Sequence, residues 1–361
     1  MVMAPYFPHM KTSDFGYNLP PDRIAQEPVK PRDQSRLLVL DRQTGSIEHR
    51  RFFEIGGFLK PGDLLVVNES KVFKARLSGT VGAGLPRPER GDRAPTEMEI
   101  FLLRPDGKRW IALAKPGRKL EVGGHITFQD GSTAQVVEKR DDGTIVLDFG
   151  RTADEVLAWT DRVGSVPTPP YVDRPPGDAE QTYQTVYAKT VGSVAAPTAG
   201  FHFTPELIEK LKSEGIRFAT VTLHVGLGTF RPIKTETIEE HQMHEEWVDV
   251  PDETMRLIEE TRTNGGRVIA VGTTTVRSLE SGVRHGFTDI FITPGYRFRF
   301  VEGLITNFHL PKSTLIILVS AFVGEKHDDP DWGRRTVLAV YEEAIRNGYR
   351  FYSFGDAMLI L

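Results

Sequence analysis

The sequence predicts a layered α/β main domain interrupted by a small all-β barrel. Strand-like and helix-like segments alternate over residues 1–68 and 151–361, which is typical of α/β domains. Residues 69–150 instead hold short alternating or β-branched runs separated by turns. The chain has 361 residues, more than one domain usually has. We therefore expect a discontinuous α/β domain (1–68 and 151–361) with an inserted β-barrel domain (69–150).

The α/β domain is predicted from apolar runs and helix-end signals. Its clearest helix spans 205–213, because Thr204 can cap it, Pro205 suits its first turn and Gly215 can end it. Two strands are expected within 36–50 and another at 62–68. The further helices are expected at 153–161, 253–263, 275–283, 314–323 and 333–346, and the further strands at 216–225, 268–272, 289–292 and 350–354.

The inserted domain is predicted from its turns. Asp106-Gly107 and Asp142-Gly143 are hairpin signals between strand-like runs, and no helical period interrupts the stretch. Residues 82–95 are rich in Gly, Pro and charge, so we expect a loop there. The proline-rich residues 166–178 are expected to form an extended connector back to the α/β domain.

Composition excludes several classes of protein. The net charge of −4 gives no overall basic field, so any contact with RNA must come from local patches. With no cysteine, the chain has no disulfide, no thiolate nucleophile and no cysteine-bound zinc or iron–sulfur cluster. The start of the chain lacks the apolar core of a signal peptide, and the longest apolar stretch, Thr314 to Val323, is too short to span a bilayer. We expect a cytoplasmic protein, without a membrane partner, that acts as a monomer.

Four segments combine a strand end with small or hydroxyl residues and then a helix start or tight loop. They are residues 192–204, 222–232, 270–281 and 306–315. In open α/β sheets, ligands bind beyond the carboxyl ends of the strands, where free backbone N–H groups gather. These four segments are therefore expected to converge on one pocket.

The candidate site residues named from these four segments are threonines, histidines, an arginine and two phenylalanines. Thr273 and Thr274 with Arg277 could hold a carboxylate or phosphate, although a threonine helix cap with a surface arginine is an equal alternative. His202, His224 and His309 lie at strand-to-loop junctions, which suits general acids or bases, but each could also be structural. The run of small residues before Phe201 and Phe203 would let the backbone touch a flat ligand, or it marks a tight helix–strand crossing.

Two other functional classes remain open from the residues alone. His241 and His244 have the spacing of one helix face and could belong to a metal-dependent hydrolase, although no His-Glu-x-x-His motif is present. A non-catalytic RNA-binding protein that uses the β module as an adaptor is the other alternative.

The chain closely resembles the S-adenosylmethionine:tRNA ribosyltransferase-isomerase family of queuosine biosynthesis. Matching blocks occur at both ends and through most of the α/β region. They include LPPDRIAQEP, RDQSRLLVLDR, LKPGDLLVVN, YQTVYAK with GSVAAPTAGFHFT, TLHVGLGTFRPI, HQMHEEWVDV, VGTTTVRSLES, NFHLPKSTLIILVSAF and GYRFYSFGDAMLI. The resemblance implies an α/β domain with an inserted six-stranded barrel.

The resemblance also implies the reaction. The ribosyl part of S-adenosylmethionine, the co-substrate, would move onto the 7-aminomethyl-7-deazaguanine at the wobble position of tRNA, giving epoxyqueuosine-tRNA, adenine and methionine. This polar chemistry would need no metal and no iron–sulfur cluster. A base would remove a proton beside the sulfonium, and an acid would assist the departure of adenine.

Roles for individual residues follow from the implied reaction. The acid and base are expected among His202, His224 and His309, and an aromatic face at Phe201, Phe203 or Tyr187 would meet the sulfonium. The cofactor site would further comprise Thr198, Thr273, Thr274 and Arg277. Contacts with the tRNA are expected from Lys71, Arg76, Lys115, Arg118 and Arg297.

Overall fold

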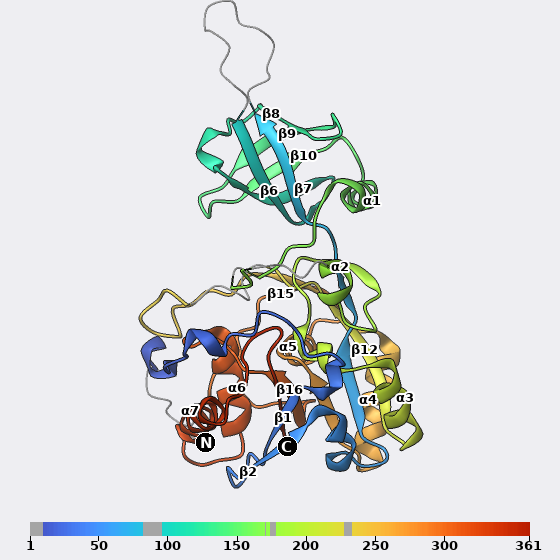
Figure 1. Ribbon diagram of the computed structural model, residues 1–361, viewed down its shortest axis with the longest axis vertical. Coiled ribbons are helices and arrows are strands. Elements are labelled where there is room, and N and C mark those ends of the chain that lie inside the picture. Colours follow the sequence, from blue (N-terminus) through green and yellow to red (C-terminus); the bar gives the residue numbers. More distant parts are fainter. Residues whose placement is uncertain (1–9, 82–95, 170, 174–177, 227–232) are drawn as a thin grey trace, which may run out of the picture. The chain divides into compact units, whose positions relative to one another are not determined.

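The computed structural model describes residues 10–81, 96–169, 171–173, 178–226 and 233–361 (Figure 1). The chain divides into two compact units. An α/β unit contains the chain up to Lys71 together with Pro169–Thr190 and Ala196–Leu361, and a barrel unit contains Val72–Thr168 and Val191–Ala195. The predicted fold class, a discontinuous α/β domain with an inserted β-barrel, is confirmed.

The α/β unit is built on a nine-stranded mixed sheet, counted over the described residues. Its centre is parallel, with β12, β3, β14 and β16 side by side, and antiparallel neighbours extend both edges. In spatial order the strands are β15 (His285–Thr288), β13 (Glu246–Asp249), β12 (Arg217–Leu223), β3 (Leu64–Asn68), β14 (Val268–Val271), β16 (Gly303–Asn307), β17 (Ala357–Ile360), β1 (Arg36–Leu40) and β2 (Ile47–Arg51).

Helices cover both faces of this sheet, and alternation along the strands explains why. In β3, Leu64 and Val66 belong to one hydrophobic cluster, and Leu65 and Val67 belong to another, because successive side chains point to opposite faces. The first face packs on α4 (Asp252–Thr263), α5 (Thr273–Glu280), α6 (Thr314–Gly324) and α7 (Trp332–Arg346), and the second packs on α3 (Pro205–Ser213) and the 3₁₀ segment Phe52–Phe58. α2 is the short helix Ala179–Thr182.

The barrel unit is a closed antiparallel barrel of six strands within its described residues. The order around it is β10 (Ile145–Asp148), β7 (Arg109–Lys115), β6 (Thr96–Asp106), β5 (Arg76–Val81), β8 (His125–Phe128) and β9 (Thr133–Lys139). Closure leaves no free edge strand, and the alternating side chains fill the interior. The short strands β4 (Ser70–Val72) and β11 (Thr190–Ser193) pair with each other where the chain passes between the units.

The barrel unit extends beyond the expected boundary at residue 150. It includes α1 (Ala153–Val163) and continues to Thr168. The reason is Trp159, whose ring packs edge-on against Phe128 at 4.9 Å and whose Nε1 donates to Asp130 at 2.8 Å. Helix α1 therefore completes the barrel core, although its helical period resembles that of the α/β domain.

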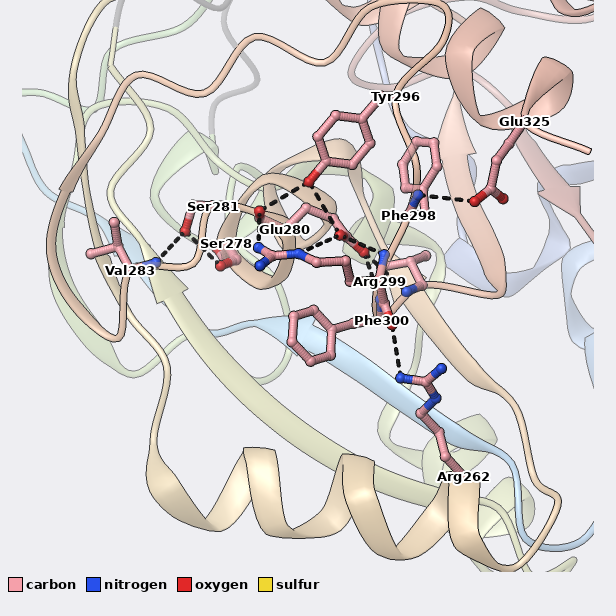
Figure 2. Close-up of polar contacts among 11 residues, drawn as sticks. Arg262, Ser278, Glu280, Ser281, Val283, Tyr296, Phe298, Arg299, Phe300 and Glu325 are labelled. Atoms are coloured by element: carbon pink, nitrogen blue, oxygen red, sulfur yellow. Dashed lines mark hydrogen bonds and ion pairs between the residues drawn. The ribbon is translucent and has the colours of Figure 1, made fainter. Parts of the chain in front are cut away.

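Most predicted elements of the α/β unit are observed, and two predicted strands lie at other positions. The predicted helix 205–213 has the observed bounds of α3. The strand predicted near 289–292 lies earlier, because the observed strand β15 ends at Thr288. The chain then leads to residues 299–301, whose backbone N–H groups donate to the buried carboxylate of Glu280 (Figure 2). β13 and β16 were not predicted.

The last strand lies later than predicted. The stretch 350–354 does not extend the sheet, because the Phe351 N–H donates to the Arg23 carbonyl and Tyr352 has a positive φ of 71°. The final strand is instead β17. The expected loop at 82–95 lies outside the described residues. In the described ranges, no helix is both long and apolar enough to cross a membrane.

Candidate active site

The carboxyl ends of the parallel strands carry a pocket of the α/β unit. All four segments predicted from the sequence contribute to its wall: Ala196–Ala199, Val225, Gly272–Thr274 and Thr306–Leu310. The pocket has about 650 Å³ of empty space, its mouth to solvent included. Tyr171, Ser313, Leu315, Tyr352 and Ser353 complete the lining.

Two helices begin at this pocket. Gly272, Thr273 and Thr274 at the start of α5 line it, as do Ser313 and Leu315 at the start of α6. Ser313 caps α6 by accepting the Ile316 N–H at 3.4 Å. The N-cap residue of α5 is Gly272, which has a φ of 93° and no side chain that could cap the helix. The alternative of a threonine cap is therefore wrong. Two helix N-termini with their partial positive charge therefore face one cavity.

The run of small residues before Phe201 has two separate causes. Ala196 to Ala199 line the pocket, where short side chains leave room. Gly200 lies against Tyr187, because a Cβ at that position would stand 1.9 Å from the tyrosine hydroxyl oxygen. The close packing at Gly200 is against a turn residue, and contact of the small residues with a flat ligand stays a prediction.

His309 is the histidine that lines the pocket. Its Nε2 lies 2.9 Å from the Thr306 Oγ1. Its backbone is fixed on two sides, since the His309 N–H donates to the Tyr341 hydroxyl at 3.2 Å and the Tyr17 hydroxyl donates to the His309 carbonyl. Burial lowers the pKa of His309 to about 3, so the ring is neutral at neutral pH.

His202 lies behind the pocket wall. Its Nδ1 is 2.7 Å from the Ser35 Oγ, and its Nε2 is 3.1 Å from the Asn307 side-chain nitrogen. The Thr198 hydroxyl donates in turn to the Asn307 oxygen at 3.0 Å, and Asn307 and Thr198 both line the pocket. Both ring nitrogens of His202 are thus engaged, and the ring orients two pocket residues.

Burial, with a smaller contribution from two nearby arginines, lowers the pKa of His202 to about 3. The arginines are Arg350 and Arg32, whose positive charges disfavour protonation of the ring. His202 is therefore a neutral link in a buried hydrogen-bond network.

His224 lies next to the pocket residue Val225. Its Nδ1 is 2.8 Å from the Ser70 Oγ, and its ring stacks on Trp247 with the ring centroids 5.0 Å apart. Burial lowers the pKa of His224 to about 4. The structure thus brings His309 to the pocket and places His202 and His224 just beyond its lining.

The predicted aromatic residues do not line the pocket. Phe203 is fully buried in the core, edge-on to Phe52. Phe201 stacks on Phe354, and the Arg32 guanidinium lies 5.3 Å from the centre of its ring. The aromatic residues in the lining are instead Tyr171, Tyr352 and Phe308. Phe203 was misread because large apolar residues beside a site and in a core look alike in sequence.

Arg277 was predicted to clamp a carboxylate of the ligand, and it is already paired within the protein. Its guanidinium forms an ion pair with Glu246, and both side chains are only 4% exposed. Glu246 also accepts the Gly226 N–H at 2.8 Å. The pair therefore joins α5 to β13 and to the turn after His224, so Arg277 is a brace behind the site.

Asn68 is a residue that sequence reasoning did not select. It ends β3, is fully buried, donates to the Leu223 carbonyl at 3.0 Å and to the Thr274 Oγ1 at 3.3 Å, and accepts the Ser70 and Leu223 N–H groups. Its position at the end of a predicted strand was the available signal. Asn307, Glu246 and the pocket tyrosines Tyr171 and Tyr352 were also missed as site residues.

Residues 12–360 match the family model described as queuosine biosynthesis protein. The chain belongs to this family. The family resemblance predicted from the sequence motifs is thereby confirmed.

Relatives in the queuosine biosynthesis protein family match the whole chain. The S-adenosylmethionine:tRNA ribosyltransferase-isomerases of Thermotoga maritima and Moorella thermoacetica are 49% and 48% identical, covering 98% of this chain and 100% of each relative. A crystal structure of S-adenosylmethionine tRNA ribosyltransferase from Thermotoga maritima is similar with a TM-score of 0.54 and 40% identity, covering 97% of this chain and 100% of the other.

The basic residues predicted to contact RNA occur on both units of this family member. Lys71 and Arg297 are exposed on the α/β unit, and Lys115 and Arg118 are exposed on the barrel. Arg76 is half-buried on β5 and lies 3.8 Å from a Glu99 carboxylate oxygen. Contact of these residues with RNA stays a prediction.

The metal-site alternative gains no support from the queuosine biosynthesis protein fold. Among the described residues, no three His, Cys, Asp or Glu side chains are grouped so that they could hold a metal ion. His241 instead packs edge-on against Phe291 at 5.4 Å.

Proposed function

We propose that the chain is an S-adenosylmethionine:tRNA ribosyltransferase-isomerase. It would transfer and rearrange the ribosyl group of S-adenosylmethionine onto 7-aminomethyl-7-deazaguanine at the wobble position of tRNA. The products would be epoxyqueuosine-tRNA, adenine and methionine. The observation that carries the proposal is full-length identity of 48–49% to relatives with this name, and the pocket at the strand ends supports it.

The pocket has the chemistry to take S-adenosylmethionine. The methionine carboxylate would lie at the N-termini of α5 and α6, where backbone N–H groups and the Thr273 and Thr274 hydroxyls are available. Thr198 would contact the ligand from the opposite segment. Arg277 would support this arrangement from behind, through its ion pair with Glu246.

The sulfonium would lie near the pocket tyrosines. The Tyr171 and Tyr352 rings are 4.6 Å apart between centroids, and attraction between a cation and an aromatic face is worth about 0.5–2 kcal/mol. Tyr187 and Phe201 act indirectly, by supporting the segment that carries Thr198 and Ala199. The chemistry would be polar, with no metal and no iron–sulfur cluster.

For the tRNA partner, we propose phosphate contacts from Lys71, Arg76, Lys115, Arg118 and Arg297. Affinity that depends on such contacts falls steeply as salt rises. The protein would act as a monomer in the cytoplasm.

One incubation tests the proposed function. Purified protein is mixed with S-adenosylmethionine and tRNA that carries the 7-aminomethyl-7-deazaguanine, and the nucleosides are analysed by mass spectrometry. We expect epoxyqueuosine in the tRNA and one adenine released for each modified tRNA. Unmodified tRNA is the control. Absence of both products in the presence of bound S-adenosylmethionine would exclude the function.

A further inference from the structure

The side chain of His309 is held at the pocket with its two ring nitrogens in different surroundings. Nε2 has one partner, the Thr306 Oγ1 at 2.9 Å. Nδ1 has no hydrogen-bond partner in the described part of the chain. A side-chain nitrogen without a partner can be either buried or accessible, and Nδ1 of His309 is not one of the buried ones. It therefore reaches open space, and the pocket is the open space that His309 lines.

The Thr306 hydroxyl determines which nitrogen carries the proton. Thr306 is 1% exposed, and its hydroxyl has one hydrogen-bond partner in the described ranges, His309. If the hydroxyl accepted from Nε2, its own proton would be buried without an acceptor, at a cost of about 1–3 kcal/mol. Donation from Thr306 to Nε2 avoids this cost. In a neutral imidazole the proton must then be on Nδ1.

The neutral form is the relevant one. Burial keeps the His309 ring uncharged at neutral pH, and a ring so hard to protonate is also a weak base. The fixed backbone at His309 and the bond to Thr306 leave the ring little freedom to turn. The site therefore holds a pre-oriented N–H donor that points at open space.

We propose that His309 donates a hydrogen bond from Nδ1 to a ring nitrogen of adenine and that it is not the base of the reaction. As the bond between the ribose carbon and adenine breaks, its electron pair goes to the adenine ring, and negative charge develops there. A neutral, fixed donor stabilises this charge without giving up its proton, and a proton from solvent then completes neutral adenine. Thr306 is the positioning residue that sets the tautomer. The proposal rests on the proposed function.

The tautomer is tested first, because it does not depend on activity. Nitrogen NMR of protein labelled in histidine, with the His309 signal assigned from its loss in His309→Asn, should show the proton on Nδ1. Thr306→Ser should keep this tautomer, and Thr306→Val should shift the signal toward a mixture of both. A proton on Nε2 in the unaltered protein, or no response to Thr306→Val, would overturn the inference.

The role is tested by binding and turnover. His309→Ala should lower kcat about 10²–10³-fold, the typical loss for one pre-oriented donor. His309→Asn should recover part of kcat because its amide N–H can occupy the place of Nδ1–H, whereas His309→Gln, with its longer reach, should not. Unchanged kcat in His309→Ala, or equal recovery by Asn and Gln, would contradict the role.

Separate probes identify the part of the substrate that His309 meets. Free adenine should bind His309→Ala at least about tenfold more weakly than the unaltered protein, the weakening expected for a lost hydrogen bond of about 1.4 kcal/mol. Free methionine should bind both proteins equally. Loss of methionine binding with adenine binding intact would place His309 at the carboxylate and overturn the proposal. Failure of the proposed function itself would be distinguishable, because the unaltered protein would then lack turnover while the tautomer could still be measured.

Discussion

The two ends of helix α5 use polar groups in opposite ways. At its start, Thr273 and Thr274 line the pocket, and Thr273 makes no side-chain hydrogen bond in the described part of the chain. At its end, the Glu280 carboxylate is 1% exposed and accepts the N–H groups of Arg299, Phe300 and Val301 at 2.9–3.1 Å (Figure 2). One end leaves polar groups for a ligand, and the other satisfies the protein's own backbone.

The difference separates a binding role from a stabilising one within eight residues. The Tyr296 hydroxyl also bonds to Glu280, and the Arg299 guanidinium donates to the Glu280 carbonyl at 2.7 Å (Figure 2). Glu280 thus takes the place of strand pairing for the backbone of residues 299–301. Substitutions at the end of α5 should therefore affect folding, and those at its start should affect the ligand.

Glu280→Ala should have the largest effect. Removing a buried acceptor of three backbone N–H groups leaves them unsatisfied, so we expect the free energy of unfolding to fall by about 3–5 kcal/mol. Urea denaturation measures this. Glu259→Ala, at an exposed position of α4, is the matched control and should change stability by less than about 0.5 kcal/mol. A comparably small loss for Glu280→Ala would refute the stabilising role.

The buried histidines at the pocket, His202 and His309, should make the stability of the fold depend on pH. The pKa values of His202 and His309 are lowered to about 3 in the folded protein, whereas unfolded histidine titrates near about 6.5. Below about pH 6.5 the unfolded chain binds protons that the folded chain does not, so stability falls as pH falls toward about 3. Each buried histidine contributes a slope of about 1.4 kcal/mol per pH unit in this window.

Stability measured between pH 7 and 5 checks this expectation. His309→Asn should flatten the dependence relative to the unaltered protein. His285→Asn, which replaces a histidine whose side chain is 72% exposed, is the control and should leave the slope as it is. An identical slope in both variants would mean that His309 does not couple folding to protonation.

Thr273→Val should weaken binding without weakening the fold. It preserves shape and removes one hydroxyl, so the Kd for S-adenosylmethionine should rise about tenfold, or about 1.4 kcal/mol, while stability changes by less than about 0.5 kcal/mol. Calorimetry and urea denaturation measure the two quantities. Thr263→Val on the exposed end of α4 is the control. If Thr273→Val lowered stability and left the affinity unchanged, the start of α5 would have a stabilising role and no binding role.

Ser313→Ala should give the smallest effect, and it should lower both stability and ligand affinity. Ser313 both caps α6 and lines the pocket. Loss of the cap should cost about 1 kcal/mol of stability, and the affinity for S-adenosylmethionine should fall severalfold. Ser213→Ala, at the exposed end of α3, is the control. An effect on stability alone would limit the ligand site to α5.

Local signals predicted most helices, because caps and helical periods are written in consecutive residues. Pro205 to Ser213 is helical as predicted, and the pocket was correctly expected at the strand ends, where Thr273 and His309 lie. The strand predicted near 289–292 lies earlier, as β15, because its position is set by pairing with β13, which lies elsewhere in the sequence. Helix α1 was assigned to the wrong unit because its period does not tell which core it covers.

The residues by themselves determined the alternation of strands and helices, the absence of thiol chemistry and the family motifs. Tertiary structure alone decided which polar groups line the pocket. Arg277 and His309 both read as site residues, but Glu246 neutralises the first and Thr306 leaves one nitrogen of the second open. Such pairing depends on side chains brought together from distant segments, and burial makes each unsatisfied group costly, so only the folded chain settles the choice.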